Sequence, residues 1–136
     1  MELGGRLPAM SLAVVGARWP NKDGSDRMFE ILLCTPGEPV ELVPQPKHKK
    51  DENAVAVFSA RAVQIGYITA ERAPWVRRIL RSGREATAVY QRKSEWGAWI
   101  RVAFDGEQPV VAIETVDDRS VEPEFYPDEE WPVGFE

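Results

Sequence analysis

The feature that most constrains this chain is a succession of short apolar segments separated by turn-forming residues. Segments of this length, rich in Val, Ile and aromatic residues and bounded by Gly, Pro, Asp or Asn, are typical of β-strands. We expect seven strands, at residues 11–18, 28–34, 40–43, 53–58, 62–68, 85–93 and 98–104, and residues 109–116 are a candidate for a last one. The segments at 53–58 and 62–68 are close enough to form a hairpin.

One segment has helical spacing instead. Pro74 suits the first position of a helix, and Gly83 suits its end. We therefore predict a helix over residues 74–82. Its apolar side chains recur at helical spacing, at Val76, Ile79 and Leu80. The other side of this helix carries arginines that we expect to face outward, namely Arg77, Arg78 and Arg81, with Arg84 just beyond.

Many short strands with little helix favour a closed or sandwiched sheet over alternating strand–helix units. We therefore expect a mainly β protein, a small OB-like or SH3-like β-barrel with one or two short helices. A chain of 136 residues fits one compact domain. We place that domain at residues 11–116, between a flexible leader at 1–10 and an acidic tail at 117–136 that also contains aromatic residues.

Single-copy residues exclude several chemistries. With one cysteine, Cys34, and one histidine, His48, the chain cannot supply the three or four nitrogen and sulfur ligands of a zinc site or form an internal disulfide. It has no Gly-rich phosphate loop, no apolar run long enough to span a membrane and no secretory signal pattern. We expect a non-enzymatic, cytoplasmic binding protein without metal or cofactor. A hydrolase that uses carboxylates is the weakest alternative.

The net charge of −5 conceals an uneven distribution. Residues 1–103 contain 16 Lys or Arg and 11 Asp or Glu, whereas residues 104–136 contain one Arg and 11 Asp or Glu. A mildly basic body is therefore joined to a strongly acidic tail, and the overall charge does not argue against a nucleic-acid partner.

A lysine-rich loop is the first candidate site. It contains three lysines in four positions, followed by an acid and an amide, in the run Lys47, His48, Lys49, Lys50, Asp51, Glu52 and Asn53. Such a patch suits phosphate contacts, which weaken as salt rises, and a carboxylate can accept a hydrogen bond from a sugar hydroxyl. The structural alternative is a solvated loop in which Asp51 or Asn53 closes an Asx-turn.

Arg18 and Trp19, where the first strand ends, form the second candidate. An exposed Trp beside an Arg can stack on a base while the Arg meets a phosphate or the ring itself. The alternative is a Trp folded over the edge of the core. Trp96 and Trp99 flank Gly97, and we expect one of these two rings to be in the core.

Together these segments resemble the HIRAN domain, most confidently over residues 11–82. The resemblance rests on the order of VVGARW, PVELVPQP, KDENAVAV and QIGYI, followed by a short helix that begins with Ala73-Pro74. It implies an OB-like barrel, of a kind found in eukaryotic fork-remodelling helicases and in stand-alone bacterial proteins. It also implies binding of single-stranded DNA with recognition of its 3′ end, in DNA repair or replication-fork processing.

In the best understood members, an Arg–aromatic pair follows the first strand, and an aspartate accepts a bond from the terminal 3′-hydroxyl. The resemblance puts Arg18 and Trp19 in the first role and Asp51 in the second, with Asn53 at the matching Asn position. The family's second stacking aromatic falls on Lys50, and two asparagine-type positions fall on Lys47 and His48. These departures favour general single-strand binding over 3′-end selectivity.

The tail gives a second function hypothesis, a protein-interaction adaptor. Acidic residues alternate there with aromatics, at Phe125, Tyr126, Trp131 and Phe135. A segment of this composition can dock on its own domain, bind a partner protein or compete with nucleic acid for the basic surface. The oligomeric state is not indicated by the sequence.

Overall fold

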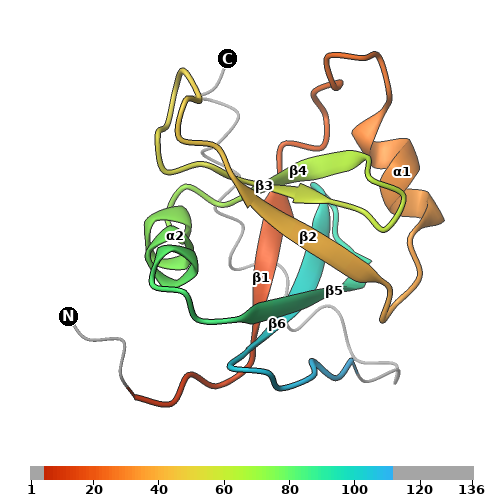
Figure 1. Cartoon of the computed structure of the whole chain (residues 1–136). Coiled ribbons are helices and arrows are strands. Elements are labelled where there is room, and N and C mark those ends of the chain that lie inside the picture. The colour runs from red at the N-terminus through yellow and green to blue at the C-terminus, as the bar shows by residue number, and fades with distance from the viewer. Residues whose placement is uncertain (1–4, 112–136) are drawn as a thin grey trace.

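A computed structural model describes residues 5–111, which form six strands and two helices (Figure 1). In chain order the elements are β1 (Met10–Val15), α1 (Arg27–Leu33), β2 (Pro39–Pro44), β3 (Val55–Phe58), β4 (Gln64–Ile68), α2 (Ala73–Arg81), β5 (Ala86–Lys93) and β6 (Ala98–Phe104). The acidic tail predicted at residues 117–136 lies outside the described residues.

The six strands close into a barrel in the order β1-β4-β3-β2-β5-β6. Every pairing is antiparallel, and β1 joins the two ends of the sheet. Val14 lies opposite Ile68 of β4 on one side and Ala98 of β6 on the other. Closure satisfies the backbone groups that a sheet edge would leave exposed. The predicted mainly β barrel with short helices is confirmed.

Apolar side chains from the strands fill the barrel. Leu12, Val14, Ile65 and Ile100 are almost completely buried, as alternation along a strand requires. Helix α2 covers this core with the apolar face predicted from its spacing, through Val76, Ile79 and Leu80. Of the two tryptophans that flank Gly97, Trp99 is buried and Trp96 is 42% exposed.

The prediction of a buried strand at residues 28–34 is wrong, because helix α1 occupies this segment. The side chain of Asp26 caps the helix by accepting a hydrogen bond from Phe29 N at 3.0 Å. Three residues at helical spacing form its buried face, namely Arg27, Glu30 and Ile31. The apolar residues that favoured a strand are instead exposed, namely Phe29, Leu32 and Leu33. A short apolar run does not distinguish the two structures.

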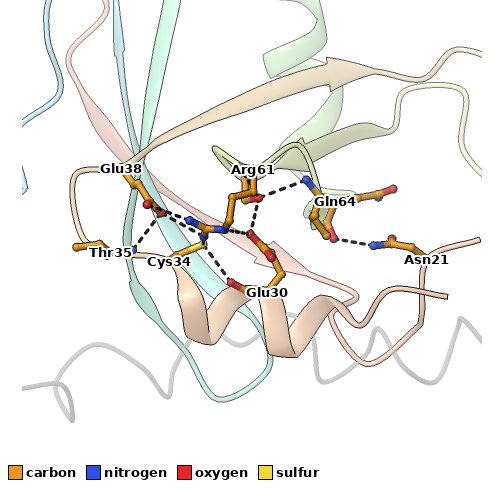
Figure 2. Close-up of polar contacts among 9 residues, drawn as sticks. Asn21, Glu30, Cys34, Thr35, Glu38, Arg61 and Gln64 are labelled. Carbon is orange, nitrogen blue, oxygen red and sulfur yellow. Dashed lines mark hydrogen bonds and ion pairs between the residues drawn. The ribbon is translucent and has the colours of Figure 1, made fainter. Parts of the chain in front are cut away.

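An ion-pair cluster fixes α1 against the barrel (Figure 2). Glu30 is buried, and its Oε2 accepts hydrogen bonds from Arg61 Nε at 2.6 Å and from Ser59 Oγ at 2.7 Å. Arg61 also pairs with Glu38, which lowers the pKa of that carboxyl. Cys34 lies beside this cluster, where burial raises the pKa of its thiol to about 11. The thiol is therefore protonated and poorly nucleophilic.

Two other expectations concern the chain ends. Residues 109–111 form no strand, and the rest of the candidate last strand, up to residue 116, lies outside the described residues. Strand β1 begins at Met10, and Leu7 packs against the core, so part of the predicted leader contacts the domain.

Gly66 in β4 permits a close approach of two strands. Its φ is +154°, and an added Cβ would overlap the carbonyl oxygen of Val15 in β1. Backbone atoms at this point cannot move without disturbing the β1–β4 pairing. The glycine in the QIGYI motif is therefore required by strand packing.

We expect Gly66→Ala to lower the free energy of unfolding by at least about 3 kcal/mol. Gly83→Ala is the matched control, because Gly83 also has a positive φ, +89°, but has open space around it. It should cost only about 1 kcal/mol, from backbone strain alone. Urea unfolding followed by circular dichroism measures both values. Equal losses would show that the contact with β1 is unimportant.

Candidate nucleic-acid interface

Three segments that are distant in the sequence surround an open groove at one end of the barrel. They are residues 16–27 after β1, the β2–β3 loop at 45–54, and residues 62–70 in and around β4. The first two rise beyond the strands at the top of Figure 1. The groove has a volume of about 1700 Å³, which is large enough for more than a single small molecule.

Six of the eight residues predicted as a site line this groove, namely Trp19, Lys47, His48, Lys49, Lys50 and Asp51. The other two are adjacent to it. The guanidinium of Arg18 lies 5.0 Å from the centre of the Trp19 ring, and Asn53 N donates to Asp51 Oδ1 at 2.8 Å. The fold therefore brings together two segments that are about thirty residues apart in the sequence.

Backbone hydrogen bonds close the lysine-rich loop at its base. Gln45 N donates to Ala54 O at 2.8 Å, which extends the β2–β3 pairing by one step. His48 N donates to Gln45 O at 3.0 Å, and Ala54 N donates to Asp51 O at 3.0 Å. Each end of the loop thus forms a tight turn, and the lysines are presented between the two turns.

His48 organises the loop from within. Its Nδ1 accepts hydrogen bonds from the backbone N–H groups of Lys50 and Asp51, at 3.1 and 3.2 Å. An Nδ1 that accepts is unprotonated, so any proton on the neutral ring is carried by Nε2. The ring also meets Tyr67 of β4 edge to face, with centroids 5.3 Å apart. In this structure His48 therefore shapes the loop that carries the three lysines.

Asp51 closes an Asx-turn, which is the structural alternative considered for this loop. Its Oδ1 accepts the bond from Asn53 N, and only this one oxygen is used. Within residues 5–111 the second carboxylate oxygen, Oδ2, has no hydrogen-bond partner. The turn holds the carboxylate in place at the groove. Because the turn uses only Oδ1, Oδ2 can still accept a hydrogen bond from a ligand.

The arginines of α2 differ in their surroundings. Arg77 is half-buried and its Nη1 donates to the carbonyl of Glu52, so it ties the helix to the lysine-rich loop. Arg78 and Arg81 are exposed, as predicted. Arg84 pairs with Asp105 at 2.8 Å, so its charge has a partner in the described protein. None of these four side chains lines the groove.

Trp19 is at the mouth of the groove and is 36% exposed. Its backbone N–H donates to Gly16 O at 3.2 Å, so a tight turn directly after β1 places the ring. Arg18 covers part of the indole through a cation–π contact. The predicted combination of an aromatic surface and a cation is present at this strand end.

The groove residues that were not predicted from the sequence include a polar cluster of Asn21, Arg27 and Tyr67. Arg27 is 8% exposed, and its guanidinium lies 5.4 Å from the centre of the Tyr67 ring. Desolvation on burial lowers the pKa of Arg27. Spacing along the chain does not reveal this cluster, because it forms only when residues 16–27 fold onto β4.

Cations outnumber acids along the groove. Its cationic side chains are Lys22, Arg27, Lys47, Lys49 and Lys50, and its acidic side chains are Asp23 and Asp51. Hydrogen bonds from Ser25 lower the pKa of Asp23, so this acid is ionised at neutral pH. Even with both acids ionised, the groove is net positive, and a concave positive surface attracts polyanions.

Fold and groove together define a small β-barrel binding module. The family model of the HIRAN domain matches residues 12–105, which is more than half of the chain. This chain therefore belongs to the HIRAN domain family, whose members are generally DNA-binding modules.

Two crystal structures share the fold. The HIRAN domain of human HLTF is similar with a TM-score of 0.57 and 19% identity, over 71% of this chain and 74% of that chain. A protein from Lactobacillus plantarum is similar with a TM-score of 0.55 and 17% identity, over 69% of this chain and 94% of that chain. A search of curated proteins gave no match. Neither helix of the described region is long and apolar enough to cross a membrane.

The contacts of His48 predict a local effect of its removal. In His48→Ala the amides of Lys50 and Asp51 lose their acceptor, and we expect their hydrogen exchange to become about fivefold faster. His48→Asn is the control, because its side-chain oxygen can occupy the place of Nδ1. Hydrogen exchange followed by NMR measures both. Unchanged exchange in His48→Ala would show that the ring does not hold the loop.

Proposed function

We propose that this HIRAN domain binds single-stranded DNA in the groove, without catalysing a reaction. The observation that carries this proposal is the position of Trp19 beside the lysine-rich loop and Asp51, around one net-positive groove. A strand of nucleic acid offers stacking bases, phosphates and sugar hydroxyls at short intervals. Each of these groups has a matching side chain on the groove wall.

Stacking and charge have separate places in this proposal. Trp19 stacks on a base, an interaction that tolerates any sequence because every base has a flat face. Arg18, Lys47, Lys49 and Lys50 contact phosphates. Contacts with about three phosphates would give a slope near −2 when the logarithm of the binding constant is plotted against the logarithm of salt concentration.

Asp51 is proposed to accept a hydrogen bond from a terminal 3′-hydroxyl. Its Oδ2 has no partner within the described residues, and the Asx-turn fixes the orientation of the carboxylate. A carboxylate at this position also repels a terminal 3′-phosphate. The proposed selectivity therefore combines one charge-assisted hydrogen bond with one electrostatic repulsion.

Lys50 makes this groove differ from the best understood members of the family. They have a second stacking aromatic at this position, and its absence removes an interaction worth about 1–3 kcal/mol per base. Lys50 supplies a cation instead. We therefore expect a larger share of the affinity to come from phosphates, with 3′-end capture adding to it. DNA repair or replication-fork processing is the proposed context, following the resemblance to fork-remodelling helicases.

We expect the chain to bind a single-stranded oligonucleotide with a 3′-hydroxyl about tenfold more tightly than the same oligonucleotide with a 3′-phosphate. Fluorescence anisotropy with a 5′-labelled strand measures the two affinities. Asp51→Asn should remove most of this difference, because an amide oxygen can still close the turn but is uncharged. Selectivity that survives Asp51→Asn would contradict the role of Asp51. Equal binding of both ends by the unaltered chain would leave a general single-strand binder.

Stacking and charge can be separated by a pair of substitutions. Trp19→Ala should weaken binding by about 1–3 kcal/mol without changing the salt slope, because it removes no charge. Lys49→Gln should reduce the steepness of the slope by about 0.7, because it removes one phosphate contact. Anisotropy titrations at several salt concentrations measure both quantities. A changed slope in Trp19→Ala, or an unchanged one in Lys49→Gln, would contradict the assigned roles.

A further inference from the structure

The buried guanidinium of Arg27 has an unusual environment. Its Nε donates to Asn21 Oδ1 at 2.7 Å, and its Nη1 donates to Gly16 O at 2.9 Å. The ring of Tyr67 lies beside it. These partners are all neutral, and within residues 5–111 no carboxylate lies within ion-pair distance of Arg27.

The ion pair of Glu30 shows how unusual this is. Glu30, three residues further along the same helix, is also buried, and it pairs with Arg61 at 2.6 Å (Figure 2). Burying an ion without a partner of opposite charge carries a large desolvation cost. The described part of the fold compensates the carboxylate of α1 but gives its guanidinium no counter-ion.

The groove is where such a counter-ion can come from. Arg27 lines the groove together with Asn21, Tyr67 and the lysine-rich loop. A guanidinium has five N–H donors, and two of them donate to Asn21 and Gly16. Interaction with the side chain of Tyr67 raises the pKa of Arg27 but only partly offsets the effect of burial, which lowers it. The remaining donors form a planar fork that matches two oxygens of a phosphate.

Asn21 keeps this fork in one orientation. Its side-chain oxygen receives the Nε bond, while its Nδ2 donates to Gln64 O and to Ser25 Oγ, both at 3.0 Å. Figure 2 shows the amide of Asn21 directed at Gln64. The guanidinium is thus held from the segment after β1 and from β4 before any ligand arrives, which reduces the entropy lost on binding.

We propose that Arg27 is an anion subsite on the wall of the groove, which binds a phosphodiester of the DNA strand through its unused N–H donors. This inference rests on the proposed function and deepens it, because it assigns a phosphate contact to a rigid, buried group. The exposed lysines attract the strand over a distance, whereas Arg27 fixes one phosphate in register.

The test uses the full chain and a labelled oligothymidylate with a free 3′-hydroxyl. We expect Arg27→Gln to weaken binding about tenfold and to reduce the steepness of the salt slope by about 0.7 to 1. Arg81→Gln is the matched control, because it removes the same charge from an exposed position outside the groove. Arg81→Gln should change the affinity and the salt slope much less than Arg27→Gln does. Equal effects of the two variants would overturn the proposal.

A second measurement assigns the contact to one phosphate. Oligonucleotides that each carry one uncharged methylphosphonate are bound to the unaltered chain and to Arg27→Gln. At one position the methylphosphonate should weaken binding to the unaltered chain about tenfold and leave binding to Arg27→Gln nearly unchanged. If the methylphosphonate weakens binding to Arg27→Gln as much as it weakens binding to the unaltered chain at every position, the proposal is overturned.

Two outcomes are distinguished from failure of the subsite: a variant that does not fold, and a chain that does not bind DNA. If Arg27→Gln does not fold, Arg27→Lys takes its place in the methylphosphonate experiment, where loss of the fork should reduce the effect at the same position. If the unaltered chain does not bind the oligothymidylate, the proposed function itself fails. If it binds, and Arg27 variants bind equally well, only the subsite fails.

Discussion

The pairing of β1 on both of its edges is the constraint on which the rest of the structure depends. Val14 lies opposite residues of β4 and β6, so this strand closes the barrel. Closure also brings residues 16–27 beside β4 and the lysine-rich loop, because they directly follow β1. Gly66 permits this arrangement, since a side chain there would overlap β1. The groove is therefore a consequence of barrel closure.

Within the groove, polar contacts set the geometry and the lysines and Arg27 make the surface net positive. The ring nitrogen Nδ1 of His48 and the carboxylate oxygen Oδ1 of Asp51 accept hydrogen bonds from backbone N–H groups of the lysine-rich loop and so fix its conformation. Arg77 fixes the same loop from α2. A loop held in this way presents its charges at defined positions, so binding does not require the loop to be ordered first. This preorganisation is what the proposed binding site has beyond a generally basic surface.

The fold class could be predicted from the sequence because strand length, turn residues and alternation are local properties. Strand β6 and the hairpin of β3 and β4 were placed nearly as observed for this reason. Helix α1 could not be predicted, because its apolar run fits either structure and its stability comes from Asp26 and from the long-range pair of Glu30 with Arg61. Glu30 interrupts this apolar run, and its burial in a helix is explained only by its ion pair with Arg61, which is distant in the sequence.

The candidate site was predictable in part, for a similar reason. Trp19 and the residues from Lys47 to Asp51 stand out because of their residue types and their order in the chain. Arg27 and Tyr67 do not stand out, because an arginine in a polar loop and a tyrosine in a strand are ordinary. Arg27 draws attention only in the folded chain, where it is buried and its guanidinium lies near the ring of Tyr67. The resemblance to a family identified the residues at the mouth of the groove and left its buried wall unassigned.

An NMR titration of the ¹⁵N-labelled full chain with a single-stranded oligonucleotide tests the central claim most directly, because it locates the ligand without altering the protein. The account predicts that the largest shifts occur at the indole of Trp19, at the amides from Lys47 to Asp51 and at Nε of Arg27. Shifts confined to the exposed side of α2 or to residues 117–136, with the groove unaffected, would contradict it.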